Sequence, residues 1–288
     1  MNLILHTSNQ EELYCSLENL FNVRKEFIHL YILKHMSELK DQTAPFKDIN
    51  LSYFLMFLSL KANRVVDFPD FDGITISHLT TRTSAQNIIE EPLYNLFETL
   101  TKKTELKLRL ESIGLTFFEE DGKLKTVFHE KTVDWRTYLS GDEYPTAQMI
   151  INRLEGNRFG PPDKCVNGFL FGGNIYENGN VRHIQYLPEI VENILRILGK
   201  HQLIRDLCRE LSPYIIKFAV PIDDIIFDGY KKLTLKQTQF RIIRHCLHYL
   251  SNQHYRSWGQ YDNPIIRVVD ERSVPADQIV SVEKVDPQ

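Results

Sequence analysis

Hydrophobic side chains recur at helical spacing through the first part of the chain. The segment from Ser8 to Glu11 fits a capping box, in which a serine oxygen and a glutamate three residues later satisfy the free amides at a helix start. The apolar positions behind it keep close to helical spacing: Leu13, Leu17, Leu20, Phe21, Phe27, Ile28 and Tyr31. A second helix is predicted over residues 48–63, and a turn-like segment, Phe68–Gly73, follows it. The pattern therefore predicts a helical N-terminal region over residues 1–70.

Beyond residue 73 the pattern becomes one of strands mixed with helices. Ile74–His78 alternates apolar and polar residues, as a half-buried strand does. Further strands are predicted at 125–129, 166–171, 214–220, 265–269 and 279–285, and helices at 84–100, 146–154, 187–199, 201–211 and 234–251. This irregular order does not fit the even alternation of a doubly wound parallel sheet. We therefore predict an α+β fold, with the helical region followed by a mixed, mainly antiparallel sheet core over residues 71–288.

Composition removes several classes of function. The chain has 34 Lys and Arg against 38 Asp and Glu, a net charge of −4, which argues against a general polyanion binder. No apolar run approaches the length of a membrane-spanning helix. The first residues lack the basic start and apolar middle of a secretory signal. We expect a cytoplasmic-type reducing environment, and translocation into another cell without a cleaved signal remains open.

Metal and nucleotide signatures are not found in the sequence. The four cysteines lie far apart without a Cys-x-x-Cys pair, which argues against a zinc site and against a disulfide framework. His245 and His248 are spaced three apart, but no second cluster completes a metal site, so no metal is predicted. The chain also lacks a phosphate-binding P-loop, a Rossmann glycine motif, a nucleophile elbow and a zinc-protease motif.

The long predicted helix at 234–251 carries a basic stripe. No acidic residue lies between Lys231 and Arg256. The stripe consists of residues at i, i+3, i+4 and i+7: Arg241, Arg244, His245 and His248. One interpretation is a surface that contacts nucleic acid, another polyanion or an acidic partner. The other is a solvent-exposed helix face whose positive charges are balanced by acidic neighbours.

One segment resembles a known family. The strand Ile76–Thr80, followed by the segment Ser84–Leu93, is similar to the first motif of the ADP-ribosyltransferase superfamily, in the His-x-Ser/Thr branch of diphtheria-type toxins, poly(ADP-ribose) polymerases and bacterial toxin transferases. The resemblance implies that His78 contacts the ribose of NAD and that the hydroxyl of Thr80 supports His78. It also implies that Asn87, on the helix that follows, is one of the NAD-binding residues. Arg82 is expected either to reach the NAD phosphates or to pair with a surface glutamate.

Two further motifs of that family have weaker counterparts. The segment Gly168–Tyr176 is similar to the strand whose aromatic residue stacks on nicotinamide, which makes Phe171 or Tyr176 the expected stacking ring; the alternative is that these are ordinary turn and core residues. The family's catalytic glutamate would fall near residue 264, where this chain has no carboxylate. Asp262, before the predicted strand, or Glu271, after it, is the expected substitute; the alternative is that the carboxylate is absent, as in family members that have lost activity.

The resemblance implies an ADP-ribosyltransferase-type sheet core and an enzyme that uses NAD as its substrate. ADP-ribose would pass from NAD to a macromolecular acceptor, a protein more readily than a nucleic acid, and nicotinamide would be released. The setting would be a toxin or a translocated effector, with residues 1–70 recognising the target or covering NAD. The alternative function is a non-enzymatic protein that binds through the basic helix at 231–256. A hydrolase with unidentified residues is a third possibility.

Overall fold

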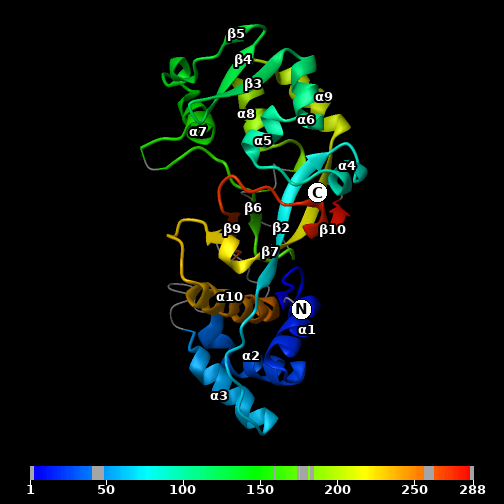
Figure 1. Ribbon diagram of the computed structural model, residues 1–288, viewed down its shortest axis with the longest axis vertical. Helices are drawn as coiled ribbons and strands as arrows, with labels where there is room; N and C mark the ends of the chain where they lie inside the picture. The colour runs from blue at the N-terminus through cyan, green and yellow to red at the C-terminus, as the bar shows by residue number, and fades with distance from the viewer. Residues whose placement is uncertain are drawn as a thin grey trace. The chain divides into compact units, whose positions relative to one another are not determined.

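The computed structural model describes residues 3–40, 49–158, 160–173, 175, 181, 185–255 and 263–285, without the side chains of Lys40, Asn87 and Tyr255. The fold is mixed α+β, as the sequence predicts (Figure 1). The ADP-ribosyltransferase type of core remains a prediction. None of the helices within the described ranges is long and apolar enough to cross a membrane.

The chain forms two compact units, each assembled from three stretches. The first contains Met1–His78, Asn167–Arg182 and Lys217–Arg267, and the second contains Leu79–Val166, His183–Ile216 and Val268–Gln288. This division differs from the predicted one, which has a single boundary at residue 70. The N-terminal helices share a unit with strand and helix residues from the second half of the chain.

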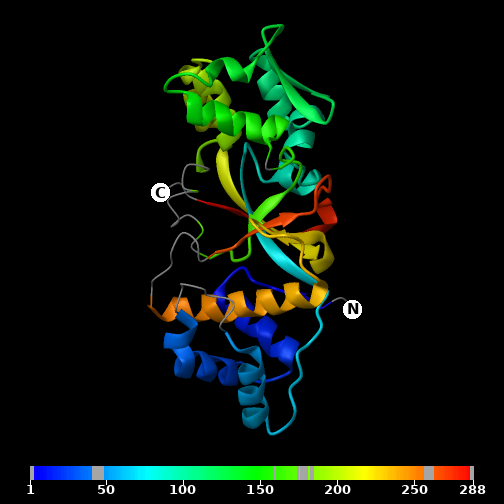
Figure 2. The ribbon, with the colours of Figure 1, turned by 90° about the vertical axis from the view of Figure 1, so that its left-hand side faces the viewer.

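Helices dominate one part of the first unit (Figure 2). They are α1 (Gln10–Phe21), α2 (Lys25–Lys40), α3 (Leu51–Ala62) and α10 (Leu235–Tyr255). Helix α1 begins one residue later than the predicted capping box, because Asn9 accepts from the Glu12 amide at 2.9 Å and donates to the Glu12 carboxylate. It ends at Asn22, which adopts the left-handed conformation that asparagine tolerates. This break separates α1 from α2, although the apolar residues keep close to helical spacing across both helices.

The larger sheet has the strand order β10-β7-β2-β6-β9-β8, with β1 beside β2. The strands are β1 (Ile4–Leu5), β2 (Gly73–Arg82), β6 (Asn167–Phe169), β7 (Ser212–Pro221), β8 (Ile225–Phe227), β9 (Ile265–Val268) and β10 (Ile279–Lys284). Strand β1 pairs with β2 in parallel. Strands β2, β6 and β9 pair antiparallel, with Ser77 opposite Phe169 and Gly168 opposite Ile266. The predicted strands at 74–78, 166–171, 214–220, 265–269 and 279–285 all contribute to this sheet.

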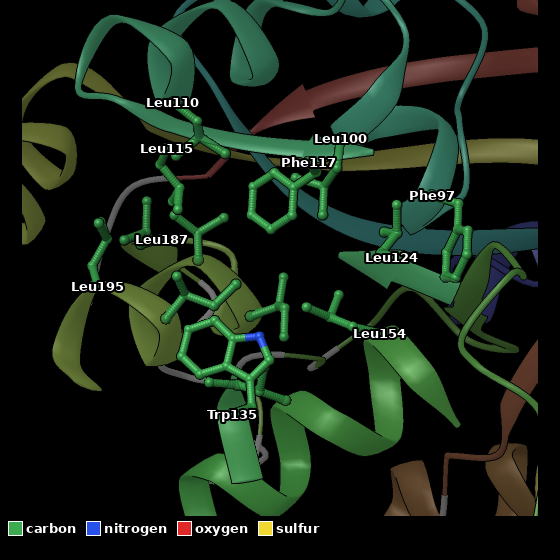
Figure 3. Packing of buried hydrophobic residues seen from close by; sticks show 14 of the residues in the cluster. Phe97, Leu100, Leu110, Leu115, Phe117, Leu124, Trp135, Leu154, Leu187 and Leu195 are labelled. Atoms are coloured by element: carbon green, nitrogen blue, oxygen red, sulfur yellow. The ribbon is translucent and has the colours of Figure 1, made fainter. Parts of the chain in front are cut away.

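The second unit holds a compact helical and hairpin core. Its elements are α4 (Gln86–Glu90), α5 (Leu96–Thr101), α6 (Glu105–Ser112), β3 (Leu115–Glu120), β4 (Lys123–Phe128), β5 (Lys131–Thr132), the 3₁₀ turn Trp135–Tyr138, α7 (Tyr144–Glu155), α8 (Glu189–Ile197) and α9 (His201–Glu210). Asp121 and Gly122 join β3 to β4, and both have the positive φ that a tight hairpin turn requires. Trp135, Leu115, Leu154 and Leu195 are among the residues packed into one apolar cluster (Figure 3).

The predicted single helix at 84–100 is wrong. The structure has two short helices there, α4 and α5, which are separated by residues 91–95. Pro92 lies in this break, and its ring has no amide hydrogen to donate to a continuing helix. Asn95 then begins α5, because its side chain accepts from the amide of Glu98 at 3.0 Å.

Candidate functional site

Strand β2 carries the first three of the predicted site residues, His78, Thr80 and Arg82. Ile74 and Ile76 are fully buried, and the strand is covered along most of its length. Alternate side chains of a strand point to the same face, so the three residues follow one another on one face of β2. His78 and Arg82 are half-buried, whereas Thr80 is buried.

The imidazole of His78 is oriented by the neighbouring strand. Its Nδ1 atom lies 2.6 Å from the carbonyl oxygen of Asn167, at the start of β6. A carbonyl oxygen only accepts, so Nδ1 is the protonated nitrogen and donates this hydrogen bond. In the neutral ring, Nε2 is then the acceptor. The bond therefore fixes both the tautomer and the direction of the ring.

Phe171 is a core residue in this structure. Its ring is fully buried and stacks on Tyr249, with centroids 4.2 Å apart and planes inclined by 10°. The amide of Asn263 holds its backbone, since Oδ1 accepts from the Phe171 amide at 3.0 Å and Nδ2 donates to its carbonyl at 2.8 Å. Burial raises the pKa of Tyr249 to about 12, so this ring stays neutral. The expected stacking of Phe171 on nicotinamide is therefore corrected, because a ligand cannot reach its face without opening this packing.

The glycines after Phe171 permit close approaches between segments. A Cβ on Gly172 would lie 2.8 Å from the Ser8 carbonyl oxygen, and one on Gly173 would lie 2.6 Å from the Tyr249 hydroxyl. Real Cβ atoms do not come that close to other heavy atoms. Residues 172 and 173 are thus glycine for packing reasons, beyond the turn chemistry that the sequence indicates.

Arg82 lies in a desolvated setting in the second unit. Its Nη1 donates to Thr80 Oγ1 at 2.6 Å and to the Thr81 carbonyl at 2.8 Å. Burial lowers the pKa of the guanidinium, while the charges of Glu105 and Glu91 oppose that shift. The hydroxyl of Thr80 therefore supports Arg82.

A small pocket lies beside this guanidinium. It is lined by Arg82, Ile88, Glu91, Pro92, Leu93, Tyr94, Thr99, Thr104, Glu105, Leu106 and Ile216. Its cavity volume is about 20 Å³, which is room for about one water molecule. A phosphate group does not fit this space. This pocket therefore does not hold a phosphate against Arg82, whose Nη1 is bonded to Thr80 and Thr81.

Of the two candidate carboxylates, the structure describes Glu271. This residue has a positive φ of 63° in the turn after β9, and its side chain is 75% exposed. Its carboxylate lies 3.4 Å from Lys164 Nζ, and its amide donates to the Lys164 carbonyl at 2.9 Å. Asp262, Tyr176 and the side chain of Asn87 lie outside the described residues.

No family model matches the chain, and no curated protein and no solved structure matches it. The site is therefore interpreted from its geometry. Among the residues with described placement, no group of three or more His, Cys, Asp or Glu side chains is arranged to hold a metal ion.

The basic stripe on α10 requires a correction. His248 is fully buried and His245 is 4% exposed, whereas a phosphate-binding stripe needs both on the surface. His248 Nδ1 lies 2.8 Å from the Leu39 carbonyl oxygen, so it donates into α2. Arg244 donates to the Ile49 carbonyl at 3.1 Å, and the Arg241 guanidinium lies 4.1 Å from the ring centroid of Tyr230. The four residues hold α10 to its own unit and do not form a common exposed surface.

The buried His245 gives an expected pH dependence of stability. Desolvation, with smaller contributions from the charges of His248 and Arg241, holds its pKa well below the usual 6.5 of a histidine. The unfolded chain binds a proton below about pH 6.5 while the folded chain does not, so the free energy of unfolding falls as pH falls below that value, by up to about 1.4 kcal/mol per pH unit for this group. His245→Leu should make this acid loss shallower, as measured by urea unfolding between about pH 7.5 and about pH 5.

A surface histidine supplies the comparison for this pH series. His201, at the exposed start of α9, is the matched position, and His201→Leu should leave the acid slope unchanged. Equal slopes for wild type and His245→Leu would contradict the prediction.

Sequence reasoning missed the partners that shape this region. Asn167, Tyr249 and Asn263 orient His78 and Phe171 through contacts between residues that lie 78–92 positions apart. The sequence offers a weak signal for one of them, since Asn263 precedes Pro264 at the start of a predicted strand.

Proposed function

We propose that the chain binds NAD and transfers its ADP-ribose group to a macromolecular acceptor, with release of nicotinamide. The observation that carries this proposal is the hydrogen bond from His78 Nδ1 to the Asn167 carbonyl, because it holds the half-buried imidazole in one direction on β2. In this proposal the ribose of NAD contacts that ring. The pairing of Ser77 with Phe169 also supports the proposal, since it sets the histidine strand beside the strand that leads to the Gly-rich segment.

The chemistry breaks one bond and forms one. The bond between the ribose carbon and the nicotinamide nitrogen breaks, and its electron pair leaves with nicotinamide. A nucleophile of the acceptor attacks the same carbon and releases its proton to solvent or to a base. Positive charge develops on the ribose during this exchange, and a nearby carboxylate would stabilise it. Asp262 and Glu271 remain the residues proposed for that role.

The partners and setting follow from the same proposal. NAD is the substrate, and a protein is a more suitable acceptor than a nucleic acid because α10 offers no exposed basic stripe. Recognition of the acceptor is proposed for the N-terminal helices. The proposed setting is a toxin or effector that acts in a reducing cytoplasm.

Nicotinamide release from NAD tests the proposal. Wild-type protein at saturating NAD should release nicotinamide, with water as the acceptor where no other is supplied. His78→Ala should lower this rate by about 100-fold or more, because it removes the group that holds the ribose. Nicotinamide is quantified by liquid chromatography.

Two further variants separate chemistry from folding. His78→Asn keeps a side-chain amide that can donate to the Asn167 carbonyl but removes the imidazole ring, so we expect a wild-type unfolding midpoint without nicotinamide release. His201→Ala changes an exposed histidine and should retain the full rate. The proposal fails if the wild-type protein neither binds nor consumes NAD.

A further inference from the structure

Helix α3 exposes a stripe of apolar side chains that are not buried in the core of its unit. Leu51, Phe54 and Leu58 are buried against the rest of the unit. On the outer side, Tyr53 is 41% exposed, Met56 50% and Leu60 75%. These positions recur at helical spacing, so they form one continuous ridge along α3. Exposed apolar side chains gathered on one helix face mark a binding surface.

Two lysines and one glutamate lie beside this ridge. The glutamate is Glu38 of α2, whose Oε2 lies 3.4 Å from Nδ1 of His35, and the His35 ring contacts Tyr53. Helix α3 contains no acidic residue. Two ammonium groups lie near the half-buried ring of Phe57, with Lys34 Nζ 6.0 Å and Lys61 Nζ 5.9 Å from its centroid. Both lysines have stems long enough to lie along apolar surface while the charge stays in water. The surface therefore joins an apolar ridge to a rim whose two lysines outnumber its one glutamate.

A second copy of the chain does not suit this surface. A helix of 12 residues presents a face of about 18 Å by 10 Å, far less than the roughly 800 Å² per partner of a stable interface. The occupant must instead carry negative charge and accept a convex apolar ridge.

We propose that α3 docks on an anionic lipid surface. Tyr53, Met56 and Leu60 would enter the boundary between headgroups and acyl chains, and Lys34 and Lys61 would contact the lipid phosphates. A bilayer needs no preformed groove to accept a convex ridge, which favours it over an acidic protein partner. Figures 1 and 2 draw α3 at the edge of the helical part of the first unit. The binding is peripheral and reversible.

Vesicle co-sedimentation tests this surface with the full chain. The protein should bind vesicles of phosphatidylcholine and phosphatidylglycerol at low salt, and it should bind pure phosphatidylcholine vesicles at least tenfold more weakly. Met56→Ser with Leu60→Ser should weaken binding to the mixed vesicles about tenfold, because less apolar surface is buried. Lys34→Gln with Lys61→Gln should weaken it by a similar factor and should remove most of its dependence on salt.

A control variant and four outcomes complete the test. Leu108→Ser changes a comparably exposed leucine, 48% exposed on α6, and should leave vesicle binding unchanged. All the replaced residues of α3 are surface residues, so thermal unfolding should match wild type. Wild-type protein that does not bind the mixed vesicles overturns the proposal, and so does equal binding by the Met56 and Leu60 variant. Two other results would assign the surface to a protein partner and overturn the lipid proposal. One is binding to a poly-glutamate peptide without vesicle binding, and the other is self-association that is lost in the Met56→Ser, Leu60→Ser variant.

Discussion

Trp135→Ala should lower the free energy of unfolding by about 3–5 kcal/mol. The indole is 1% exposed and lies in the apolar cluster of the second unit, among leucines from β3, β4 and α7 (Figure 3). Its Nε1 also donates to the hydroxyl of the buried Thr126 at 3.1 Å. Alanine would leave a cavity the size of the indole and a hydroxyl without its donor, and urea unfolding at neutral pH measures both effects together.

Two other replacements separate these contributions. Trp135→Phe keeps most of the volume and loses the hydrogen bond, so its cost should be about 1–2 kcal/mol. Tyr144→Ala removes an aromatic ring that is 50% exposed at the start of α7, and it should change stability by less than about 0.5 kcal/mol. A Trp135→Ala protein within about 1 kcal/mol of wild type would show that the cluster closes around the lost ring.

The elements that the sequence predicts well are those with strong local periodicity. The alternation at Ile74–His78 lies within β2, and the predicted helix at 234–251 lies within α10 apart from its first residue. Both are long segments in which side-chain spacing and burial agree. Between Ser8 and Tyr31 the structure has two helices, and they are separated by the left-handed backbone of Asn22. The spacing of apolar residues carries no information about that backbone conformation.

The environment of the candidate site could not be read from local patterns. His78 is placed on a strand by its neighbours, but its orientation depends on the carbonyl of Asn167, which lies 89 residues further along the chain. The same limit applies to Phe171, whose ring is covered by Tyr249. A strand pairing or an aromatic stack between distant segments has no signature in the spacing of either segment.

Charge on a helix is equally ambiguous in a single sequence. The stripe from Arg241 to His248 has the spacing of a surface, yet its two histidines are buried. The apolar positions of α3 have the spacing of a core, yet Met56 and Leu60 are exposed. Which face of a helix is covered is decided by its neighbours: here α2 covers His248 of α10, which bonds to Leu39, and Phe227 of β8 stacks on His245.

Gly168→Val should lower the free energy of unfolding by about 3 kcal/mol. Gly168 lies in the middle of β6, between β2 and β9. A Cβ at this position would lie 2.4 Å from Ile76 Cγ2 and 2.9 Å from the Ser77 carbonyl oxygen. The first contact can relax through a side chain, but the second is with backbone. The valine must therefore push β2 and β6 apart, which strains the pairing that orients His78.

A matched glycine and a second substitution make this prediction specific. A Cβ added at Gly160 would meet no heavy atom within 4 Å, and this residue has no positive φ, so Gly160→Val should cost little. Adding Ile76→Ala to Gly168→Val should relieve the side-chain contact. The double variant should therefore lose less free energy of unfolding than the sum of the losses in the two single variants. Because the Ser77 carbonyl remains, it should still be less stable than Ile76→Ala alone. Equal unfolding midpoints for Gly168→Val and Gly160→Val in urea would show that β6 tolerates a side chain against β2, and the close approach of these strands would then not require glycine.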